Sequence, residues 1–357
     1  MLSANSNYKE IKKQLKKFKP KYFIINNQIV YHKILKKNKF EKTVILNSFL
    51  KISKKVKFDI TISAIVGIAG LEPTIQFTRI SKKVLLANKE SIICGWHLIR
   101  NISKKNKTIM VPIDSEHYSI DQLTKNFKNE DIKKIYITAS GGPFLRRSLK
   151  SFGKISPKEA ATHPKWKMGT KISIDSSNLM NKTLELIEAY RLFPFTPNKY
   201  EIIIHPQSLV HAIVFFKNGQ STFLYHPTDM KIPIANAIYD NKINIEKLIK
   251  IKNSDLFKIK YLNFEKVDKK RFPIVTLLNN KIYQNSGPII LNASNEILVD
   301  RFIKKKLHYR GIYQSLKRVF KDRDFNKYAI KKSPNINEIY KIDKWARNKT
   351  VEIIEKK

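Results

Sequence analysis

The hydrophobic pattern of the first third of the chain predicts helices that alternate with strands. The Lys-rich stretch 8–18 predicts a helix, and the short apolar runs 21–25 and 83–87 predict strands. Residues 59–66 form a near-continuous apolar run, which is typical of a buried parallel strand and ends in a tight turn at 67–70. Alternating strands and helices imply a parallel sheet that binds ligands at the carboxyl ends of its strands.

The pattern changes twice in the rest of the chain. Further strands, the last two joined by a hairpin turn, are predicted at 134–138, 201–205, 209–216 and 221–225. Residues 239–270 form a polar, Lys-rich connector. From Pro273 onward the pattern is helical, with one helix opening at 291–296 and the last running over 335–355.

Residues 144–172 predict a mobile loop, because they lack a strong period and contain Pro157 and Pro164. In this loop, Trp166 and Met168 are placed to cover an apolar part of a substrate. The alternative, that Trp166 is an ordinary core residue, stays open.

A helix is predicted after Asp175-Ser176-Ser177, three residues that all suit an N-cap. At about 100° per residue, a polar stripe on this helix contains Asn178, Asn181, Lys182 and Glu185. Helix starts attract anions, so the stripe predicts a phosphate site with a carboxylate one turn further on. A solvated helix face is the alternative interpretation.

Two acidic residues follow the apolar strand end at 109–113. On an extended segment Asp114 and Glu116 project to the same side, where they repel unless a cation or a proton joins them. With Glu185 they would form an all-oxygen site, which suits Mg²⁺ or Mn²⁺ better than zinc. His117 is expected to hydrogen-bond the backbone rather than to bind a metal.

The glycines of Ser140-Gly141-Gly142-Pro143 allow close approach of the backbone to a ligand, which makes Ser140 a candidate phosphate donor. Gly-Gly-Pro is also ordinary turn chemistry, so the motif alone decides nothing. His205 and His211 are expected to be structural.

The amino-acid composition limits the classes of protein to which the chain can belong. The chain has 357 residues, 42% of them hydrophobic, so two or three domains with real cores are expected. The net charge of +41 comes mainly from Lys spread along the chain, and the signatures of a nucleic-acid module are missing. A bias toward Lys, Asn and Ile is the simpler cause. The single cysteine, Cys94, fits a reducing compartment, and no apolar run reaches membrane-spanning length.

Several short motifs resemble the 1-deoxy-D-xylulose 5-phosphate reductoisomerase family, whose members catalyse the NADPH-dependent second step of the methylerythritol phosphate route to isoprenoids. They are Ala87-Asn88-Lys89-Glu90-Ser91, Asp114-Ser115-Glu116-His117, Ser140-Gly141-Gly142-Pro143-Phe144, His163 to Gly169, Asp175-Ser176, Asn181-Lys182, Glu185 and His205-Pro206-Gln207-Ser208. No single motif is decisive, but together they are very specific, and the resemblance covers nearly the whole chain.

The resemblance implies an α/β protein with an incomplete Rossmann-like N-terminal domain, an α+β catalytic domain and a C-terminal helical domain. The expected ranges are 1–113 for NADPH binding, 114–240 for metal and substrate, 241–272 for a connector and 273–357 for the helices. A cytoplasmic homodimer is expected. Its partner would be a small phosphorylated sugar, with no specific nucleic acid and no membrane.

The resemblance also implies residue roles. The metal, Mg²⁺ or Mn²⁺, would be held by Asp114, Glu116 and Glu185, and these act in catalysis with Lys89 and His163. The substrate would contact Lys89, Ser115, Glu116, Ser140, His163, Ser176, Asn181, Lys182 and Glu185. NADPH would contact Asn5, Ser6, Asn7, Asn88, Glu90 and Gly169. The sugar phosphate would rearrange its carbon skeleton and then be reduced to 2-C-methyl-D-erythritol 4-phosphate.

The beginning of the chain departs from the family. The family opens with a strand and a Gly-Ser-Thr-Gly-Ser-Ile-Gly turn that holds the NADPH pyrophosphate, whereas residues 1–7 resemble the end of the second strand and its loop. We therefore expect the first βα unit to be missing and the chain as given to bind NADPH poorly, while it keeps metal and phosphonate-inhibitor binding. An inactive or regulatory remnant is one alternative. A nucleic-acid-binding protein, suggested only by the charge, is another.

Overall fold

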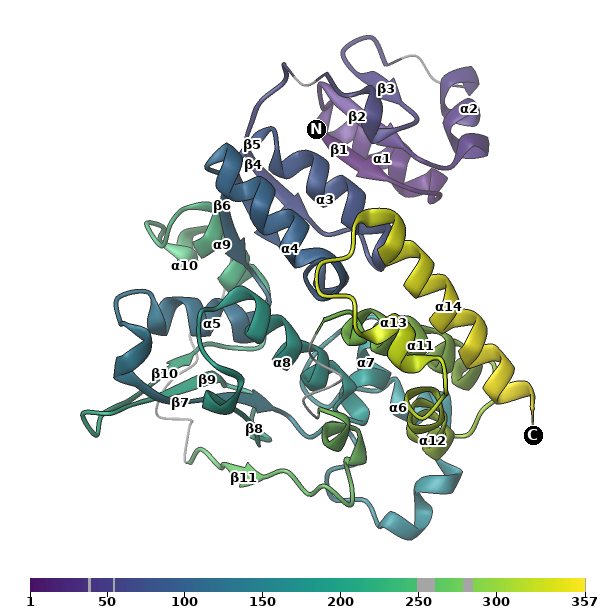
Figure 1. Cartoon of the computed structure of the whole chain (residues 1–357). Helices are drawn as coiled ribbons and strands as arrows, with labels where there is room; N and C mark the ends of the chain where they lie inside the picture. The colour runs from purple at the N-terminus through teal and green to yellow at the C-terminus, as the bar shows by residue number, and fades with distance from the viewer. Residues whose placement is uncertain (38–39, 54, 249–260, 279–284, 357) are drawn as a thin grey trace. The chain divides into compact units, whose positions relative to one another are not determined.

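The structure is a computed structural model that describes residues 1–357 except 38–39, 54, 249–260, 279–284 and 357 (Figure 1). Residues are densely connected within two units, Met1–Asp59 and Ile60–Lys357. The domain limits expected at 113, 240 and 272 stay predictions.

The first unit is built on a parallel sheet with the strand order β1-β2-β3. Its elements are β1 (Leu2–Ala4), α1 (Tyr8–Phe18), β2 (Tyr22–Ile25), α2 (Gln28–Lys37), β3 (Val44–Leu46) and the short helix η1 (Phe49–Lys51). The side chain of Asn7 caps α1 by accepting from the Glu10 amide at 3.1 Å. Ile11 and Leu15 of α1 then pack into a core with Phe23. The helix at 8–18 and the strand at 21–25 are confirmed.

The second unit begins with a three-stranded sheet ordered β4-β5-β6, in which β5 and β6 are parallel. This part contains β4 (Phe58–Ser63), η2 (Ile68–Gly70), α3 (Leu71–Thr78), β5 (Ser81–Leu86), α4 (Lys89–Asn106) and β6 (Ile109–Pro112). The expectation of a buried strand at 59–66 is wrong in part, since β4 ends at Ser63 and Ile62 is 48% exposed. The reason is that β4 lies at the edge of its sheet.

A five-stranded mixed sheet follows, with the order β10-β9-β7-β8-β11. Its segment contains α5 (Ser115–Thr124), η3 (Asn129–Asp131), β7 (Ile132–Ala139), η4 (Leu149–Lys154), α6 (Pro157–Ala160), α7 (Thr170–Ser177), α8 (Met180–Leu192), η5 (Pro197–Lys199), β8 (Tyr200–Ile204), β9 (Val210–Phe216) and β10 (Ser221–Tyr225). β7 is parallel to β8 and antiparallel to β9, and the hairpin between β9 and β10 is confirmed. Helices α5 and α8 pack on this sheet (Figure 1).

The expected loop at 144–172 is partly regular. It contains η4, α6 and the start of α7, and its residues 144–148, 155–156 and 161–169 lack helix or strand. Its mobility stays a prediction.

The C-terminal part is helical, as predicted. It follows α9 (Lys231–Ile238), α10 (Ile245–Leu248) and β11 (Glu265–Lys266), and contains η7 (Pro273–Leu277), α11 (Gly287–Ile303), α12 (Tyr309–Phe320), α13 (Phe325–Ala329) and α14 (Ile336–Glu355). Helix α14 is capped by Asn335, which confirms the predicted last helix. Residues 291–296 do not open a helix but lie inside α11, which begins four residues earlier at Gly287 with Pro288 in its first turn.

One large core joins α3, α4 and α8 to α11, α12 and α14. In Figure 1, α14 runs beside α11, and both contact α4. Residues 60–113, expected to belong to an N-terminal domain, therefore share their core with the C-terminal helices.

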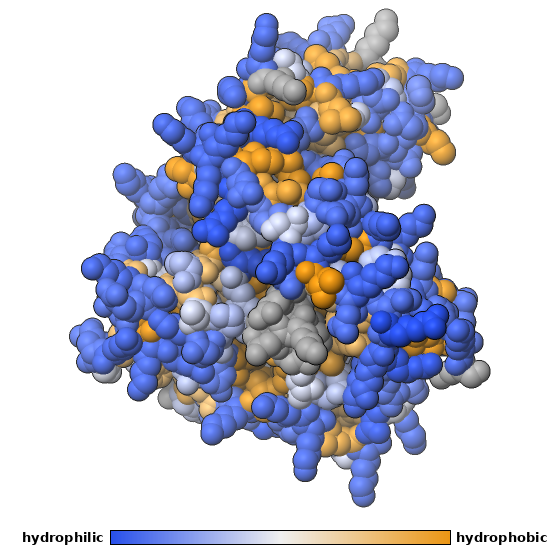
Figure 2. All heavy atoms as spheres, in the orientation of Figure 1, coloured by the Kyte–Doolittle hydropathy of each residue, from blue (hydrophilic) through white to orange (hydrophobic). Residues whose placement is uncertain are grey.

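The visible face in Figure 2 is mostly hydrophilic, with apolar side chains scattered among the charged ones. This agrees with the high Lys content of the chain. Among the described residues, no helix combines the length and the apolar character that a membrane crossing requires.

Candidate active site

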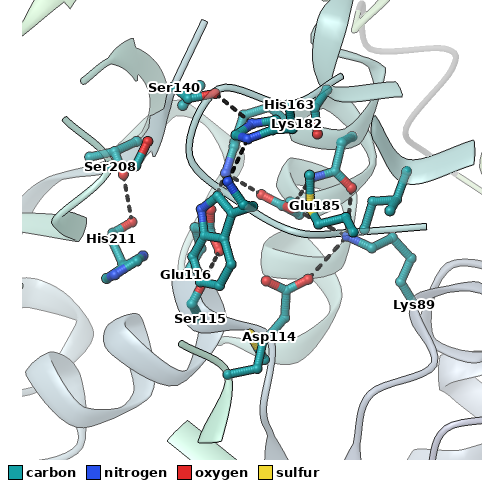
Figure 3. A pocket seen from close by; sticks show the side chains of 18 of the residues that line it. Lys89, Asp114, Ser115, Glu116, Ser140, His163, Lys182, Glu185, Ser208 and His211 are labelled. Carbon is teal, nitrogen blue, oxygen red and sulfur yellow. Dashed lines mark hydrogen bonds and ion pairs between the residues drawn. The ribbon is translucent and has the colours of Figure 1, made fainter. Parts of the chain in front are cut away.

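A pocket of about 250 Å³ opens where the chain leaves the ends of β5, β6 and β7, against the start of α8. Every residue that the sequence assigned to substrate or catalysis lines it, and Figure 3 shows most of them converging. These are Lys89, Asp114, Ser115, Glu116, Ser140, His163, Ser176, Asn181, Lys182 and Glu185. They come from loops and helices far apart in the sequence, so the fold brings them together. Their individual roles stay predictions.

Three carboxylates meet on one side of the pocket. Asp114, Glu116 and Glu185 each offer an oxygen, and these oxygens lie within 4.8 Å of one another. The sequence predicted an extended segment at Asp114–Glu116, but the structure has a helix start there. Asp114 is the N-cap of α5 and Glu116 lies in its first turn. Because Asp114 is the N-cap, with non-helical φ −58° and ψ 133°, its carboxylate can approach that of Glu116, and α8 supplies Glu185.

Two ammonium groups lie among these carboxylates. Lys89 Nζ is 3.0 Å from Asp114 Oδ2 and 3.3 Å from Glu185 Oε1. Lys182 Nζ donates to Glu116 Oε1 and lies 2.5 Å from Glu185 Oε2. Burial alone would lower the pKa of both lysines, but the surrounding carboxylates outweigh it and raise each pKa above its usual value.

The acidic groups outnumber the basic ones. Glu188, one turn beyond Glu185 on α8, adds a fourth carboxylate with its Oε2 at 3.6 Å from Lys89 Nζ, so four acids face two lysines. Burial and then the charge of Glu185 raise the pKa of Glu116 to about 8, and burial raises that of Glu188 to about 7. Burial would also raise the pKa of Asp114, but Lys89, His117, Glu116 and Lys182 together outweigh burial and hold this pKa below its usual range.

This charge balance and the donor atoms fit a divalent cation. Oxygen ligands from Asp and Glu are those that Mg²⁺ and Mn²⁺ prefer. A bound divalent charge would also relieve the repulsion that protonates Glu116. Asp114, Glu116 and Glu185 are the residues placed to hold it.

Another part of the pocket wall carries hydroxyl and amide groups. Ser176 lies in the last turn of α7 and Asn181 in the first turn of α8, and both line the pocket with Ser140. Asn181 also reaches the carboxylates, because its Oδ1 accepts from Lys89 Nζ at 3.0 Å. Gly142 has φ 62°, and a Cβ there would lie 2.8 Å from the Ser177 Cα. The glycine therefore lets the loop after β7 lie directly against the end of α7, which brings Ser140 and Ser176 to the same cavity.

The position of the proton on His163 follows from its neighbours. Backbone amides of Lys165 and Trp166 donate to Nδ1 at 3.1 and 2.8 Å, so Nδ1 accepts and Nε2 carries the proton. Nε2 then donates to Ser140 Oγ at 2.9 Å. Burial, and next the charge of Lys182, lowers the pKa of His163 to about 4, so the ring is neutral at pH 7.

The helix boundary near Ser176 differs from the prediction. Asp175, Ser176 and Ser177 are not N-caps but form the last turn of α7. The helical conformation is interrupted at Leu179, whose φ is 65°, and α8 starts at Met180. The break is held by Asn178, whose Oδ1 accepts from the Met180 amide at 2.9 Å.

The polar stripe on α8 is not a solvated face. The side chains of Lys182 and Glu185 are only 6% and 2% exposed. Asn181, Lys182 and Glu185 face the first pocket, whereas Asn178 lines a second one.

Comparison with known proteins accounts for nearly the whole chain. A family model for 1-deoxy-D-xylulose 5-phosphate reductoisomerase matches residues 1–95. A model of its C-terminal domain matches residues 110–193, and a DXP reductoisomerase C-terminal domain matches 226–349. The reductoisomerase of Pelagibacter ubique is 43% identical over 351 residues, which cover 96% of this chain and 89% of the relative. The chain belongs to the 1-deoxy-D-xylulose 5-phosphate reductoisomerase family.

Other relatives and solved structures agree. The Wolbachia pipientis reductoisomerase is 38% identical, with 100% of this chain and 90% of the relative covered. A crystal structure of DOX-P reductoisomerase in complex with NADPH, fosmidomycin and magnesium has a TM-score of 0.90 at 31% identity, covering 99% of this chain and 90% of that one. The Zymomonas mobilis enzyme in complex with NADPH has a TM-score of 0.88 at 30% identity, covering 100% and 92%. The predicted fold class is confirmed.

The residues expected to bind NADPH in this reductoisomerase family member do not line the pocket. Asn88 caps α4, and its Nδ2 donates to the Gly67 carbonyl at 3.1 Å and to Glu90 at 3.0 Å. Gly169 precedes α7, with no heavy atom within 4 Å of a Cβ built there. Asn5, Ser6 and Asn7 belong to the other unit. Their cofactor role stays a prediction.

Histidines behave largely as expected. His117 Nε2 contacts the Glu185 carbonyl at 2.8 Å, and His205 and His211 contact carbonyls of Asn263 and His226. His211 nevertheless also lines the pocket, with Trp166 at 6.0 Å between ring centroids. Trp166 is therefore part of the pocket wall rather than an ordinary core residue.

Two residues that the sequence analysis left without a role belong to this region. Ser208 lines the pocket with a positive φ of 57°. Glu188 lies seven residues after Asn181, which puts both on one helix face. The helical spacing was the available signal for Glu188, whereas no local pattern marks Ser208.

Proposed function

We propose that this chain converts 1-deoxy-D-xylulose 5-phosphate to 2-C-methyl-D-erythritol 4-phosphate, with NADPH as the reductant. The observation that carries the proposal is the single pocket in which three convergent carboxylates, two buried lysines and a hydroxyl and amide wall meet. Membership of the reductoisomerase family supports the same reaction. A remnant without activity would have no reason to keep this full set.

The carboxylate side is proposed to hold the reacting end of the substrate. Bound to Asp114, Glu116 and Glu185, Mg²⁺ or Mn²⁺ would act as a Lewis acid that polarises the substrate carbonyl. Lys89 contributes a fixed positive charge beside the oxygen on which negative charge develops. Its raised pKa keeps that charge at neutral pH.

Another part of the pocket wall is proposed to hold the phosphate. Ser140, Ser176, Asn181 and Lys182 offer hydroxyl, amide and ammonium donors. Asn181 and Lys182 also contact Glu185, so the proposed phosphate wall adjoins the carboxylates. Phosphate binding there would orient the distant carbonyl toward the carboxylates, so binding energy remote from the reaction lowers its barrier. His163 donates through Nε2 and is neutral, which suits a hydrogen bond to substrate in place of the one to Ser140.

We also propose a cytoplasmic homodimer. Support comes from Phe215 and Phe223, which lie on β9 and β10 with 40% and 51% of their surfaces exposed and which a second copy would cover. Light scattering on the purified protein tests the dimer.

The reaction is tested by mixing the protein with substrate, NADPH and Mg²⁺ or Mn²⁺ and following NADPH absorbance. At NADPH concentrations high enough to offset the weak cofactor binding expected from the sequence, we expect oxidation of NADPH that depends on both the substrate and the metal, with 2-C-methyl-D-erythritol 4-phosphate identified by mass. Turnover without added metal, after treatment with a chelator, would contradict the proposal.

A further inference from the structure

A second cavity lies among η4, η7, α12 and the junction between α7 and α8. Its volume is about 240 Å³, nearly that of the first pocket at about 250 Å³. Apart from the α7–α8 junction, it is formed by segments that play no part in the proposed reaction.

The walls of this second cavity are apolar and well packed. Phe152 and Tyr309 meet edge-on with ring centroids 6.0 Å apart, and both belong to the large core of the unit. Ile274 and Ile312 add aliphatic surface. Such walls suit a flat or branched apolar body and change shape little when it binds.

The charged residues that line the cavity are all basic. They are Lys270, Arg271 and Arg310. Arg310 donates to the Leu149 carbonyl at 2.5 Å, and Arg271 donates to the Phe144 carbonyl at 2.8 Å. Asp268, at 3.8 Å from Arg271 Nε, is outside the lining. Neutral carbonyls fix the position of these guanidinium groups without cancelling their charge.

The floor of the cavity carries a donor without a partner. Asn178 is 8% exposed, and its Oδ1 is used by the Met180 amide. Its Nδ2 is buried and has no hydrogen-bond partner among the described residues. A buried amide N–H is satisfied in most proteins, so this unpaired donor calls for an acceptor, and the cavity that Asn178 lines is where we infer that one binds.

We propose that this cavity binds a small amphipathic anion, with an aromatic or branched apolar body and a phosphate or carboxylate head. The body would pack on Phe152 and Tyr309, and Asn178, Arg310 and Lys270 would donate to the oxygens of the head. The site is separate from that of the proposed reaction. Asn178 fixes the start of α8, which carries Asn181 and Lys182. A ligand in one pocket would therefore change the affinity of the other pocket for its own ligand.

The test uses calorimetry on the full chain with 1-naphthyl phosphate, at about 0.15 M ionic strength to screen the general positive charge. Inorganic phosphate supplies the head alone, 1-naphthol the body alone, and 1-naphthoate replaces the phosphate by a carboxylate. We expect the joined molecule to bind at least about tenfold more tightly than either part, and the comparison with naphthoate to identify the head.

Variants separate this cavity from the first pocket and from general charge. Arg310→Gln should weaken the binding of 1-naphthyl phosphate about tenfold. Lys317→Gln removes an equal charge on the exposed side of α12 and should leave this affinity unchanged. Arg310→Lys keeps the charge and should retain most of the affinity. Asn178→Asp keeps the acceptor for Met180 but replaces the free donor by an acid, and should abolish binding. Equal affinity in Arg310→Gln and Lys317→Gln, or equal binding of inorganic phosphate, would overturn the proposal.

Discussion

The two pockets have nearly the same volume and share the junction between α7 and α8, but their charges are arranged differently. In the first, Lys89 and Lys182 lie within 3.3 Å of carboxylates that outnumber them. In the second, the charged lining is basic only. A mixed, acid-rich cluster selects a divalent cation together with a phosphorylated substrate, whereas a lining whose charged residues are all basic, on apolar walls, selects an anion alone.

The comparison also shows how little the net charge of +41 decides. Both pockets belong to one strongly basic chain, yet the most deeply buried charge that lines the first is the acid Glu185. The ligand that each pocket selects is therefore set by the charges that line it. Substitutions that change one charge in a pocket should alter ligand binding in that pocket more than in the other.

The largest effect is expected from Glu185→Gln. The change keeps the shape but removes one of three convergent carboxylates, so Mn²⁺ affinity should fall more than about 100-fold and activity should be lost. Mn²⁺ titration by electron paramagnetic resonance measures the affinity. Asp121→Asn on α5, a carboxylate outside both pockets, is the matched control and should bind as wild type. Equal Mn²⁺ affinity in Glu185→Gln and wild type would contradict the assignment of Glu185 as a metal ligand.

Lys182→Ala should give the next largest effect. Lys182 is the ammonium proposed to bind the phosphate, although it also pairs with Glu116 and Glu185. Substrate affinity should therefore fall about 10- to 100-fold, and affinity for a dephosphorylated analogue much less. Ser176→Ala should show the same preference more weakly. Lys171→Ala on α7, whose partner Asp175 lies outside the pocket lining, is the control. Parallel losses for both ligands would place the phosphate elsewhere.

The affinity of the first pocket for Mn²⁺ should change by about tenfold per pH unit below the pKa of Glu116. Glu116 has a raised pKa of about 8, so below that pH a metal must displace its proton. Mn²⁺ affinity should therefore rise as the pH increases from ~6 to ~8 and level off above. Titrations across this range measure it, and Glu116→Gln should bind weakly with a flatter profile. A flat profile in the wild type would contradict this expectation.

The smallest effect is expected from Glu188→Gln. Glu188 contacts Lys89 at 3.6 Å but does not line the pocket, so activity should fall by about tenfold or less with Mn²⁺ affinity nearly unchanged. Steady-state kinetics and the same metal titration measure both. A loss of metal as large as in Glu185→Gln would make Glu188 a direct ligand, which its position next to His117 allows geometrically.

Much of the fold was predictable because local patterns determine it. The helix at 8–18 carries its own cap at Asn7, and the hairpin at 217–220 carries turn residues between apolar strands. Lys89 and Asp114 were predictable neighbours, because they follow the parallel strands β5 and β6. The other residues of the first pocket come from a second sheet, a loop and helices, and were predicted from the family resemblance.

The rest depends on contacts that no local pattern reveals. Asp175-Ser176-Ser177 has the composition of a helix start but ends α7, since the buried Leu179 adopts a left-handed conformation that its sequence does not signal. The second cavity combines residues from 149 to 314 and leaves no motif. Ser208 enters the first pocket through tertiary packing alone.

The shared core of α4, α11 and α14 has a consequence for synthesis on the ribosome. Helix α4 begins with Lys89, yet the side chains that bury its other face arrive only with α11 and α14, at residues 287–303 and 336–355. N-terminal segments usually fold first as a chain emerges. Here the lysine of the first pocket cannot be held in place until almost the whole polypeptide has been made, so a prematurely terminated chain should lack the metal site even though it contains all three carboxylates.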